Sequence, residues 1–167
     1  ENIMKFTFAL LLFLIASFCF SQNTIPKVLE KLNKRTVPYI TVDELKKAQN
    51  YILLDTREYK EYTISHLPNA INVGFDKFNS KKFVAIAPDK NTKIVVYCSI
   101  GIRSETIGEK LIKLGYKNVS NLYGGIFEWK NSDCKTVNSK NIETDSIHTF
   151  NKQWSVYLKK GVKIYED

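Results

Sequence analysis

A cysteine between a predicted strand and a predicted helix is the residue of this sequence best placed for covalent chemistry. Cys98 follows the apolar run at residues 94–97 and precedes a helical pattern of apolar residues that stops at Gly115. At such a junction, amide N–H groups and the positive end of the helix dipole favour an anion. The thiolate is the reactive form of cysteine. The sequence therefore predicts a nucleophile at Cys98.

The residues that follow Cys98 suit a loop that holds an anion. Gly101 permits a tight backbone turn, and Arg103 supplies a permanent cation with a fork of N–H donors. The alternative is that Cys98 is an inert, buried filler, but the spacing of the glycine and the arginine favours the nucleophile. We expect anion contacts from Ser99, Ile100, Gly101, Ile102 and Arg103.

Strands and helices alternate on both sides of this loop. Short apolar runs predict the strands, and a capping box at Thr41 and Glu44 marks the start of one helix. This alternation predicts an α/β fold with a central, mostly parallel five-stranded sheet and helices on both faces. Ligands of such sheets bind beyond the carboxyl ends of the strands, where Cys98 lies. The predicted strands cover residues 39–40, 51–54, 71–73, 94–97 and 119–123.

The N-terminus has the pattern of a secretory signal peptide. Lys5 precedes a nearly unbroken apolar run at residues 6–20, and small Ser21 follows as the cleavage position. Residues 1–3 precede the apparent start methionine. An uncleaved anchor is an alternative, although the run is shorter than the ~20 residues that span a bilayer. A lipoprotein cleaved at Cys19 is a second alternative. We predict export, to a bacterial periplasm, with no membrane attachment after cleavage.

The remainder of the chain divides by composition. A Lys-rich stretch with weak periodicity follows the signal peptide, and a polar stretch without periodicity follows the last predicted strand and helix. Apolar residues at helical spacing from Phe150 to Leu158 then predict an amphipathic helix ended by Gly161, which docks on the domain or faces a partner. The predicted segments are a signal peptide at 1–21, a lead-in at 22–38, the domain at 39–132, a polar linker at 133–145, and a C-terminal helix and tail at 146–167.

The chain is basic, with a formal net charge of +8. Its lysines are spread along the sequence and do not cluster beside aromatic residues, so nucleic-acid binding has little support. A basic field would raise the local concentration of a small anionic substrate.

Two cysteines, Cys98 and Cys134, follow the predicted signal peptide. Two are too few for a disulfide framework in an exported protein of this size. They could pair, which would silence Cys98, but the polar surroundings of Cys134 favour an idle thiol. Histidine and cysteine are too scarce for a metal site.

Three segments, taken together, resemble the single-domain rhodaneses, a family of sulfurtransferases. They are LLDTREYKEYTISHLPNAINV at 53–73, VVYCSIGIRS at 95–104, and the run from Leu122 through Gly124–Gly125 to Trp129. The resemblance covers about residues 39–130 and implies a rhodanese-like fold. The sequence departs from the family in having Ser65 and Asn69 where glycines are frequent.

The resemblance implies persulfide chemistry without a cofactor. Cys98 would take the outer sulfur of a small anionic donor such as thiosulfate, and a thiol or cyanide, or a partner protein, would then remove it. This is covalent catalysis of the ping-pong kind. Loop N–H groups from Ser99 to Arg103 would hold the anionic persulfide. Arg103 would either clamp the donor or brace the loop.

Other polar residues of the matching segments have structural interpretations. Asp55 and Arg57 match an Asp-x-Arg signature of the family, and we expect Asp55 to pin a loop and Arg57 to form an internal ion pair. His66 precedes a Leu–Pro turn and is expected to be a structural histidine, whereas His148 is expected to be exposed.

Three other functions compete with sulfur transfer. Cysteine phosphatases of related fold carry five residues between the cysteine and the arginine, whereas four separate Cys98 from Arg103 here. The smaller ring suits sulfur, and we expect no phosphatase activity. A non-catalytic rhodanese-like binding module usually lacks the cysteine. A sulfur carrier would keep it and would pass the sulfur to a partner protein through the C-terminal helix.

Overall fold

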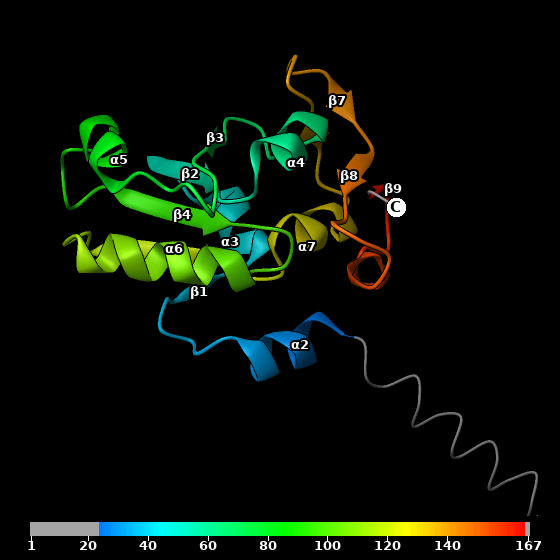
Figure 1. The fold of residues 1–167 in the computed structure, drawn as a ribbon, viewed down its shortest axis with the longest axis horizontal. Helices are drawn as coiled ribbons and strands as arrows, with labels where there is room; N and C mark the ends of the chain where they lie inside the picture. Colours follow the sequence, from blue (N-terminus) through cyan, green and yellow to red (C-terminus); the bar gives the residue numbers. More distant parts are fainter. Residues whose placement is uncertain (1–23, 166–167) are drawn as a thin grey trace, which may run out of the picture.

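A parallel five-stranded sheet forms the centre of the molecule (Figure 1). The computed structural model describes residues 24–165, so the predicted signal peptide lies outside the described residues. The strand order is β1-β5-β4-β2-β3, and all four pairings are parallel. The predicted α/β sheet is therefore confirmed. The strands are β1 (Tyr39–Ile40), β2 (Tyr51–Asp55), β3 (Ile71–Asn72), β4 (Lys93–Tyr97) and β5 (Asn118–Leu122).

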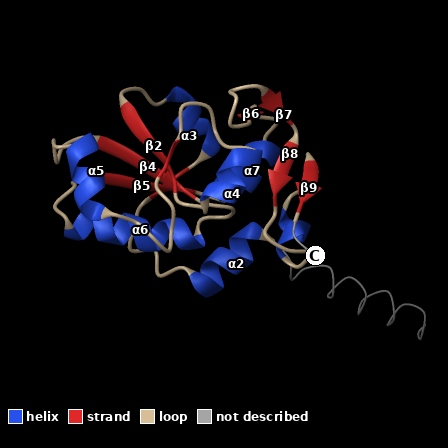
Figure 2. Cartoon of the chain, turned by 45° about the horizontal axis from the view of Figure 1, so that its top comes forward, coloured by secondary structure: helices blue, strands red, loops and turns tan. Residues whose placement is uncertain are grey.

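Helices cover both faces of the sheet (Figure 2). Neighbouring strand residues point to opposite faces, so Leu53 and Val95 join one buried cluster while Leu54 and Val96 join the other. Residues of α2, α3 and α7 complete the first cluster, and residues of α5 and α6 complete the second. The helices are α2 (Ile25–Leu32), α3 (Val42–Lys47), α4 (Tyr59–Ile64), α5 (Ser80–Ile86), α6 (Ile102–Lys113) and α7 (Gly125–Asn131).

Local signals fix the start of α3 and the end of α6. The hydroxyl of Thr41 accepts a hydrogen bond from the Glu44 N–H at 3.2 Å, and the Glu44 carboxylate accepts one from the Thr41 N–H at 2.8 Å. The predicted capping box is thus confirmed. Gly115 follows α6 in the left-handed region at φ 92°, which glycine adopts without a steric penalty.

The predicted lead-in, from residue 24 onward, packs against the domain. It contains α2, and Ile25 and Leu29 of that helix are buried in the same cluster as Leu122 and Ile126. The segment therefore belongs to the core that supports the loop after β4.

The predicted linker at 133–145 is wrong. Two short strands, β6 (Thr136–Val137) and β7 (Glu143–Thr144), pair antiparallel there. Val137 also exchanges two backbone hydrogen bonds with His66, at 2.8 and 3.0 Å. Strands of two residues are too short to leave an alternating pattern in the sequence, so a polar hairpin of this size resembles a linker.

The predicted C-terminal helix is also wrong. The parallel pair β8 (Ser146–His148) and β9 (Val162–Ile164) encloses a short 3₁₀ helix, η1 (Trp154–Tyr157). Phe150 lies before this helix with a left-handed backbone at φ 66°, which prevents a continuous α-helix from that position. The spacing of Trp154 and Tyr157 reflects a single 3₁₀ turn, in which side chains three apart lie on one side.

Within residues 24–165, no helix has the length and apolarity needed to cross a membrane.

Candidate active site

Cys98 lies at the carboxyl end of β4, the middle strand of the sheet, and begins the loop that leads into α6. The loop turns at Gly101, which is the N-cap residue of α6. Its φ of 112° is in the left-handed region. Only glycine takes this backbone conformation readily. The sequence-predicted nucleophile therefore stands where a strand meets a helix N-terminus.

Cys98 is 2 % exposed, and its sulfur faces hydrogen-bond donors. The Gly101 N–H donates to Sγ at 3.2 Å, and the Ser104 hydroxyl lies 3.5 Å from Sγ. Burial alone would raise the pKa of the Cys98 thiol, but the positive charge of Arg103 and the hydrogen bonds from Ser104 and Gly101 lower it by more. The net effect lowers the pKa, so the thiolate is favoured.

The N-terminus of α7 fixes the backbone of the loop. Ile126 N–H donates to the carbonyl of Cys98 at 2.9 Å, and Phe127 N–H donates to the carbonyl of Ser99 at 3.1 Å. Because the peptide bonds are trans, the N–H groups of the following residues point away from α7. A Cβ at Gly125 would stand 2.3 Å from the Cys98 carbonyl oxygen, so only glycine allows this approach.

Two asparagines, which sequence reasoning missed, hold the other end of the loop. The side-chain amides of Asn33 and Asn121 both donate to the Gly101 carbonyl, at 2.9 and 2.8 Å. Asn121 also accepts a hydrogen bond from the Ser104 hydroxyl at 2.7 Å. Asn33 comes from the lead-in, 68 residues away in sequence from Gly101, and no local pattern marks it.

Arg103 braces the loop through an ion pair with Glu61. Its two terminal nitrogens donate to the two carboxylate oxygens of Glu61, each at 2.7 Å, and one of them also lies 3.2 Å from the Ser99 hydroxyl. The Glu61 side chain is 1 % exposed and that of Arg103 is 23 % exposed. Burial would raise the pKa of Glu61, but the hydrogen bonds and charge of Arg103 lower it by more. Of the two roles left open by the sequence, this geometry favours the brace, and Glu61 is a residue that sequence reasoning did not place at the site.

Asp55 and Arg57 lie beneath the site and do not line it. Both side chains are fully buried, and Arg57 contacts the Asp55 carboxylate at 2.6 Å. The Tyr97 hydroxyl donates to the same carboxylate at 2.7 Å, and Arg57 donates to the Ser65 carbonyl at 2.7 Å. The expected internal ion pair is confirmed. It supports the strand end that carries Cys98.

The structure agrees with the prediction for His66 and disagrees with the prediction for His148. His66 is buried and its Nδ1 lies 3.0 Å from the Tyr62 carbonyl, in agreement with a structural role. The expectation that His148 is exposed is wrong, because His148 is 3 % exposed. Its Nδ1 accepts a hydrogen bond from the Phe150 N–H at 3.1 Å. Strand β8 carries it against α4.

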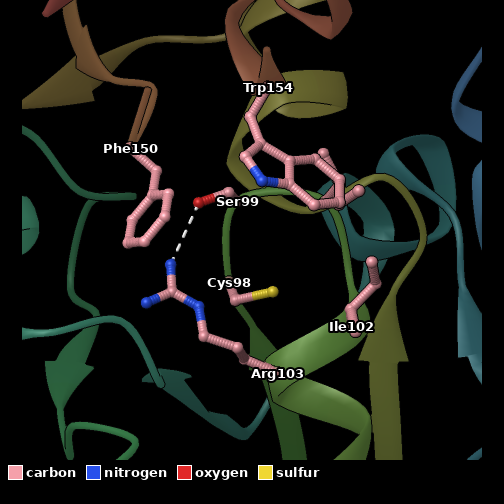
Figure 3. Close-up of a pocket in the computed structure, with 7 residues that line it drawn as sticks. Cys98, Ser99, Ile102, Arg103, Phe150 and Trp154 are labelled. Carbon is pink, nitrogen blue, oxygen red and sulfur yellow. Dashed lines mark hydrogen bonds between the residues drawn. The ribbon is translucent and has the colours of Figure 1, made fainter. Parts of the chain in front are cut away.

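A pocket of about 170 Å³ opens above Cys98 (Figure 3). Arg103 reaches across its floor toward Ser99, while Phe150 and Trp154 lie on either side of the opening. Gly101 is the one predicted loop residue that does not line it; its carbonyl is held by the two asparagines. The two aromatic residues were assigned to a helix, and their place in the site was missed. From the loop and α6, the lining residues are Cys98, Ser99, Ile100, Ile102 and Arg103.

Cys98 and Cys134 are both free thiols, so the alternative in which they pair is not what the structure contains. Among residues 24–165, no three histidine, cysteine or acidic side chains gather as a metal site would require.

The site is that of a cysteine nucleophile, held in a loop that favours the thiolate at the end of the middle strand of a parallel α/β sheet. The rhodanese-like domain family matches this chain at residues 41–132, more than half of its length. The chain belongs to the rhodanese-like family.

Individual relatives differ in name and in coverage. A tRNA uridine(34) hydroxylase of Hamiltonella defensa is 31% identical over 129 residues, which make up 75% of this chain and 34% of that protein. The thiosulfate sulfurtransferase GlpE of Coxiella burnetii is 29% identical over 96 residues, or 58% of this chain and 87% of that protein. The chain thus spans about a third of the first relative and most of the second.

Solved structures share the fold. The crystal structure of a rhodanese-related protein from Thermoplasma volcanium is 28% identical and superimposes with a TM-score of 0.53. That match covers 60% of this chain and 97% of the other. The family model thus shows the family, and the solved structure shows the shared fold.

Proposed function

We propose that the protein is a sulfurtransferase that carries a sulfane sulfur on Cys98 from a donor such as thiosulfate to a thiophilic acceptor. The observation that carries this proposal is the setting of the Cys98 sulfur. It accepts a hydrogen bond from the Gly101 N–H at 3.2 Å, its pKa is lowered, and a pocket leads to it. A thiolate in such a setting is a strong nucleophile.

The reaction has two balanced steps. The Cys98 thiolate attacks the outer sulfur of thiosulfate, the sulfur–sulfur bond of the donor breaks, and sulfite leaves with the electron pair. Cys98 then carries a persulfide anion. An acceptor thiolate, or cyanide in an assay, attacks the outer sulfur of that persulfide and leaves with it, which regenerates the Cys98 thiolate. No cofactor is required.

The loop residues have separate tasks in this scheme. N–H groups that point away from α7 stabilise the outer sulfur while it carries negative charge. Arg103 lies close enough to Cys98 to lower its pKa, yet its guanidinium is held by Glu61. It therefore acts as a fixed positive charge and a brace.

The family relationship supports the same chemistry. A relative that covers the domain is named a thiosulfate sulfurtransferase. Another relative is named a tRNA uridine(34) hydroxylase, so the family name alone does not choose the reaction. The free Cys98 and its donors favour sulfur transfer over a non-catalytic binding module.

The test is to incubate the protein with thiosulfate and to measure its intact mass. We expect the mass to rise by one sulfur atom in the wild type and in Cys134→Ser, and to stay unchanged in Cys98→Ser. Cyanide added to the loaded protein should release thiocyanate and restore the original mass. No gain of mass in the reduced wild type, or an equal gain in Cys98→Ser, would refute the proposal.

The same loaded protein separates an enzyme from a sulfur carrier. Repeated turnover with a small thiol, such as cysteine, as acceptor indicates an enzyme. Transfer to small acceptors that stops after the first equivalent indicates a carrier for a partner protein.

A further inference from the structure

Two aromatic side chains of the site come from outside the segment that the family matches. The family match ends at residue 132, whereas Phe150 and Trp154 both lie beyond it and both line the Cys98 pocket. They flank the opening above the sulfur (Figure 3). The chain thus adds an aromatic wall of its own to the family's nucleophile loop.

Phe150 is held over the pocket by a costly arrangement. Its φ of 66° is in the left-handed region, which is an outlier for a bulky residue, and the residue is 52% exposed. The conformation is fixed by the hydrogen bond from its N–H to His148 Nδ1 at 3.1 Å. The Arg103 guanidinium carbon lies 5.9 Å from the centre of its ring. Strain that places an exposed aromatic ring at a pocket points to a ligand contact.

The charge of the pocket favours a singly charged ligand over a small dianion. Both terminal nitrogens of Arg103 are bonded to the Glu61 carboxylate, so part of the positive charge that faces the pocket is already offset. The remaining walls are mainly carbon, from Ile100, Ile102 and the two aromatic rings.

The pocket also has room for an organic group. Its volume is about 170 Å³. A closed apolar cavity of ~150 Å³ binds benzene, so a phenyl ring fits beside the reacting sulfur. A bare oxyanion would leave the aromatic rings without a contact.

We propose that Phe150 and Trp154 are specificity-determining residues that bind the apolar body of an organic sulfane-sulfur donor carrying one negative charge. The proposal rests on the proposed sulfur transfer at Cys98. With benzenethiosulfonate as the probe, the Cys98 thiolate attacks the terminal sulfur, the sulfur–sulfur bond breaks, and benzenesulfinate leaves with the electron pair. The ring of the probe packs between Phe150 and Trp154.

The experiment compares two donors with the same reacting group. Benzenethiosulfonate and methanethiosulfonate have the same charge and differ in the body that the aromatic wall would contact. The kcat/KM ratio of the two donors is measured with one acceptor. In Phe150→Ala and in Trp154→Ala we expect the ratio to fall by about tenfold, because each ring buries apolar area against the ligand.

Two controls keep this result interpretable. Tyr59 is an exposed aromatic residue that does not line the pocket, and Tyr59→Ala should leave the ratio unchanged. Trp154→Phe should keep most of the preference. Because the two donors are compared on the same sample, a variant that folds incompletely loses activity with both and keeps its ratio.

The outcomes distinguish this inference from the proposed function. If Cys98 takes sulfur from both donors and the ratio is the same in all variants, the inference is overturned while sulfur transfer stands. If Cys98 takes sulfur from none of the donors, the proposed function fails. Binding of benzenesulfinate, measured by calorimetry, then decides the subsite: loss of binding in Trp154→Ala supports it, and no binding to the wild type overturns it.

Discussion

The two thiols within residues 24–165 lie in loops that shift the pKa of the cysteine in opposite directions. Cys98 is buried just before the N-terminus of α6, and its pKa is lowered. Cys134 follows the C-terminus of α7 and is more exposed, and burial raises its pKa. The more accessible thiol is thus the one that ionises less readily.

The charge of Arg103, the hydrogen bonds and the helix polarity account for the difference in pKa. The Cys98 sulfur accepts from the Gly101 N–H at 3.2 Å, which stabilises the thiolate. The Cys134 sulfur instead lies 3.6 Å from the Ser132 carbonyl, which can accept only from the protonated thiol. The positive end of a helix lies near Cys98 and the negative end near Cys134. A nearby positive charge and the direction of the donors, more than exposure, set the direction of the pKa shift of each cysteine.

The largest expected effect concerns the buried support of the Cys98 loop. Arg57→Met leaves the Asp55 carboxylate buried without its cation, and Asp55 is fully buried. We expect a loss of about 3–5 kcal/mol in the free energy of unfolding, measured by urea denaturation. The control is Lys135→Met, beside Cys134, because the Lys135–Glu143 pair is exposed and should not change stability measurably. Equal stability of the two variants would mean that the buried ion pair near Cys98 contributes no more to stability than the exposed pair near Cys134.

The next effect concerns the close approach of α7 to the Cys98 loop. Gly125→Ala places a Cβ 2.3 Å from the Cys98 carbonyl oxygen, so the backbone must shift and the N–H donors move with it. We expect the rate of sulfur transfer to fall at least about tenfold, because displacements of this size disrupt catalytic geometry.

Gly74→Ala is the matched control for that variant. Gly74 also has a positive φ, 69°, but nothing lies within 4 Å of a Cβ there. The strain of a left-handed alanine costs about 1–2 kcal/mol, and the transfer rate should be unchanged. A similar fall in rate in both variants would mean that backbone strain, and not the contact with the loop, is responsible.

How much the sequence reveals depends on how local each contact is. The Cys98 loop could be predicted because its strand, glycine, arginine and helix are contiguous. The Arg103–Glu61 pair joins residues 42 positions apart, and the contact of Asn33 with Gly101 spans 68. Neither leaves a local pattern, so only the fold reveals them.

In the C-terminal segment, a local pattern is present but predicts the wrong structure. Its apolar residues have helical spacing, yet a left-handed Phe150 and two paired strands take the place of the helix. Of the residues at that spacing, Leu158 is buried and Phe150 is exposed, so the spacing does not mark one buried face. Tertiary packing places Phe150 and Trp154 at the pocket, and the spacing of apolar residues could not predict this.

A smaller effect tests the second donor to Cys98. The Ser104 hydroxyl lies 3.5 Å from Sγ and 2.7 Å from the Asn121 side-chain oxygen, so its single proton is shared between two acceptors. Ser104→Ala should raise the pKa of Cys98 slightly and slow persulfide formation near neutral pH by about threefold. Ser139→Ala, in the exposed turn between β6 and β7, should match the wild type. A rate in Ser104→Ala equal to the wild type would assign the lowered pKa to Arg103 and to the backbone N–H groups of residues 101 and 104.

The most direct test is a titration of each thiol by itself. The ultraviolet absorbance of the thiolate is followed against pH in Cys134→Ser, which retains Cys98, and in Cys98→Ser, which retains Cys134; Cys19 is replaced by serine in both if the N-terminal segment is present. Because a lowered pKa keeps the thiolate charged to lower pH, we predict a midpoint for Cys98 below the ~8.5 of a free cysteine and a midpoint for Cys134 above it. A Cys98 midpoint at or above that of Cys134 would contradict the account.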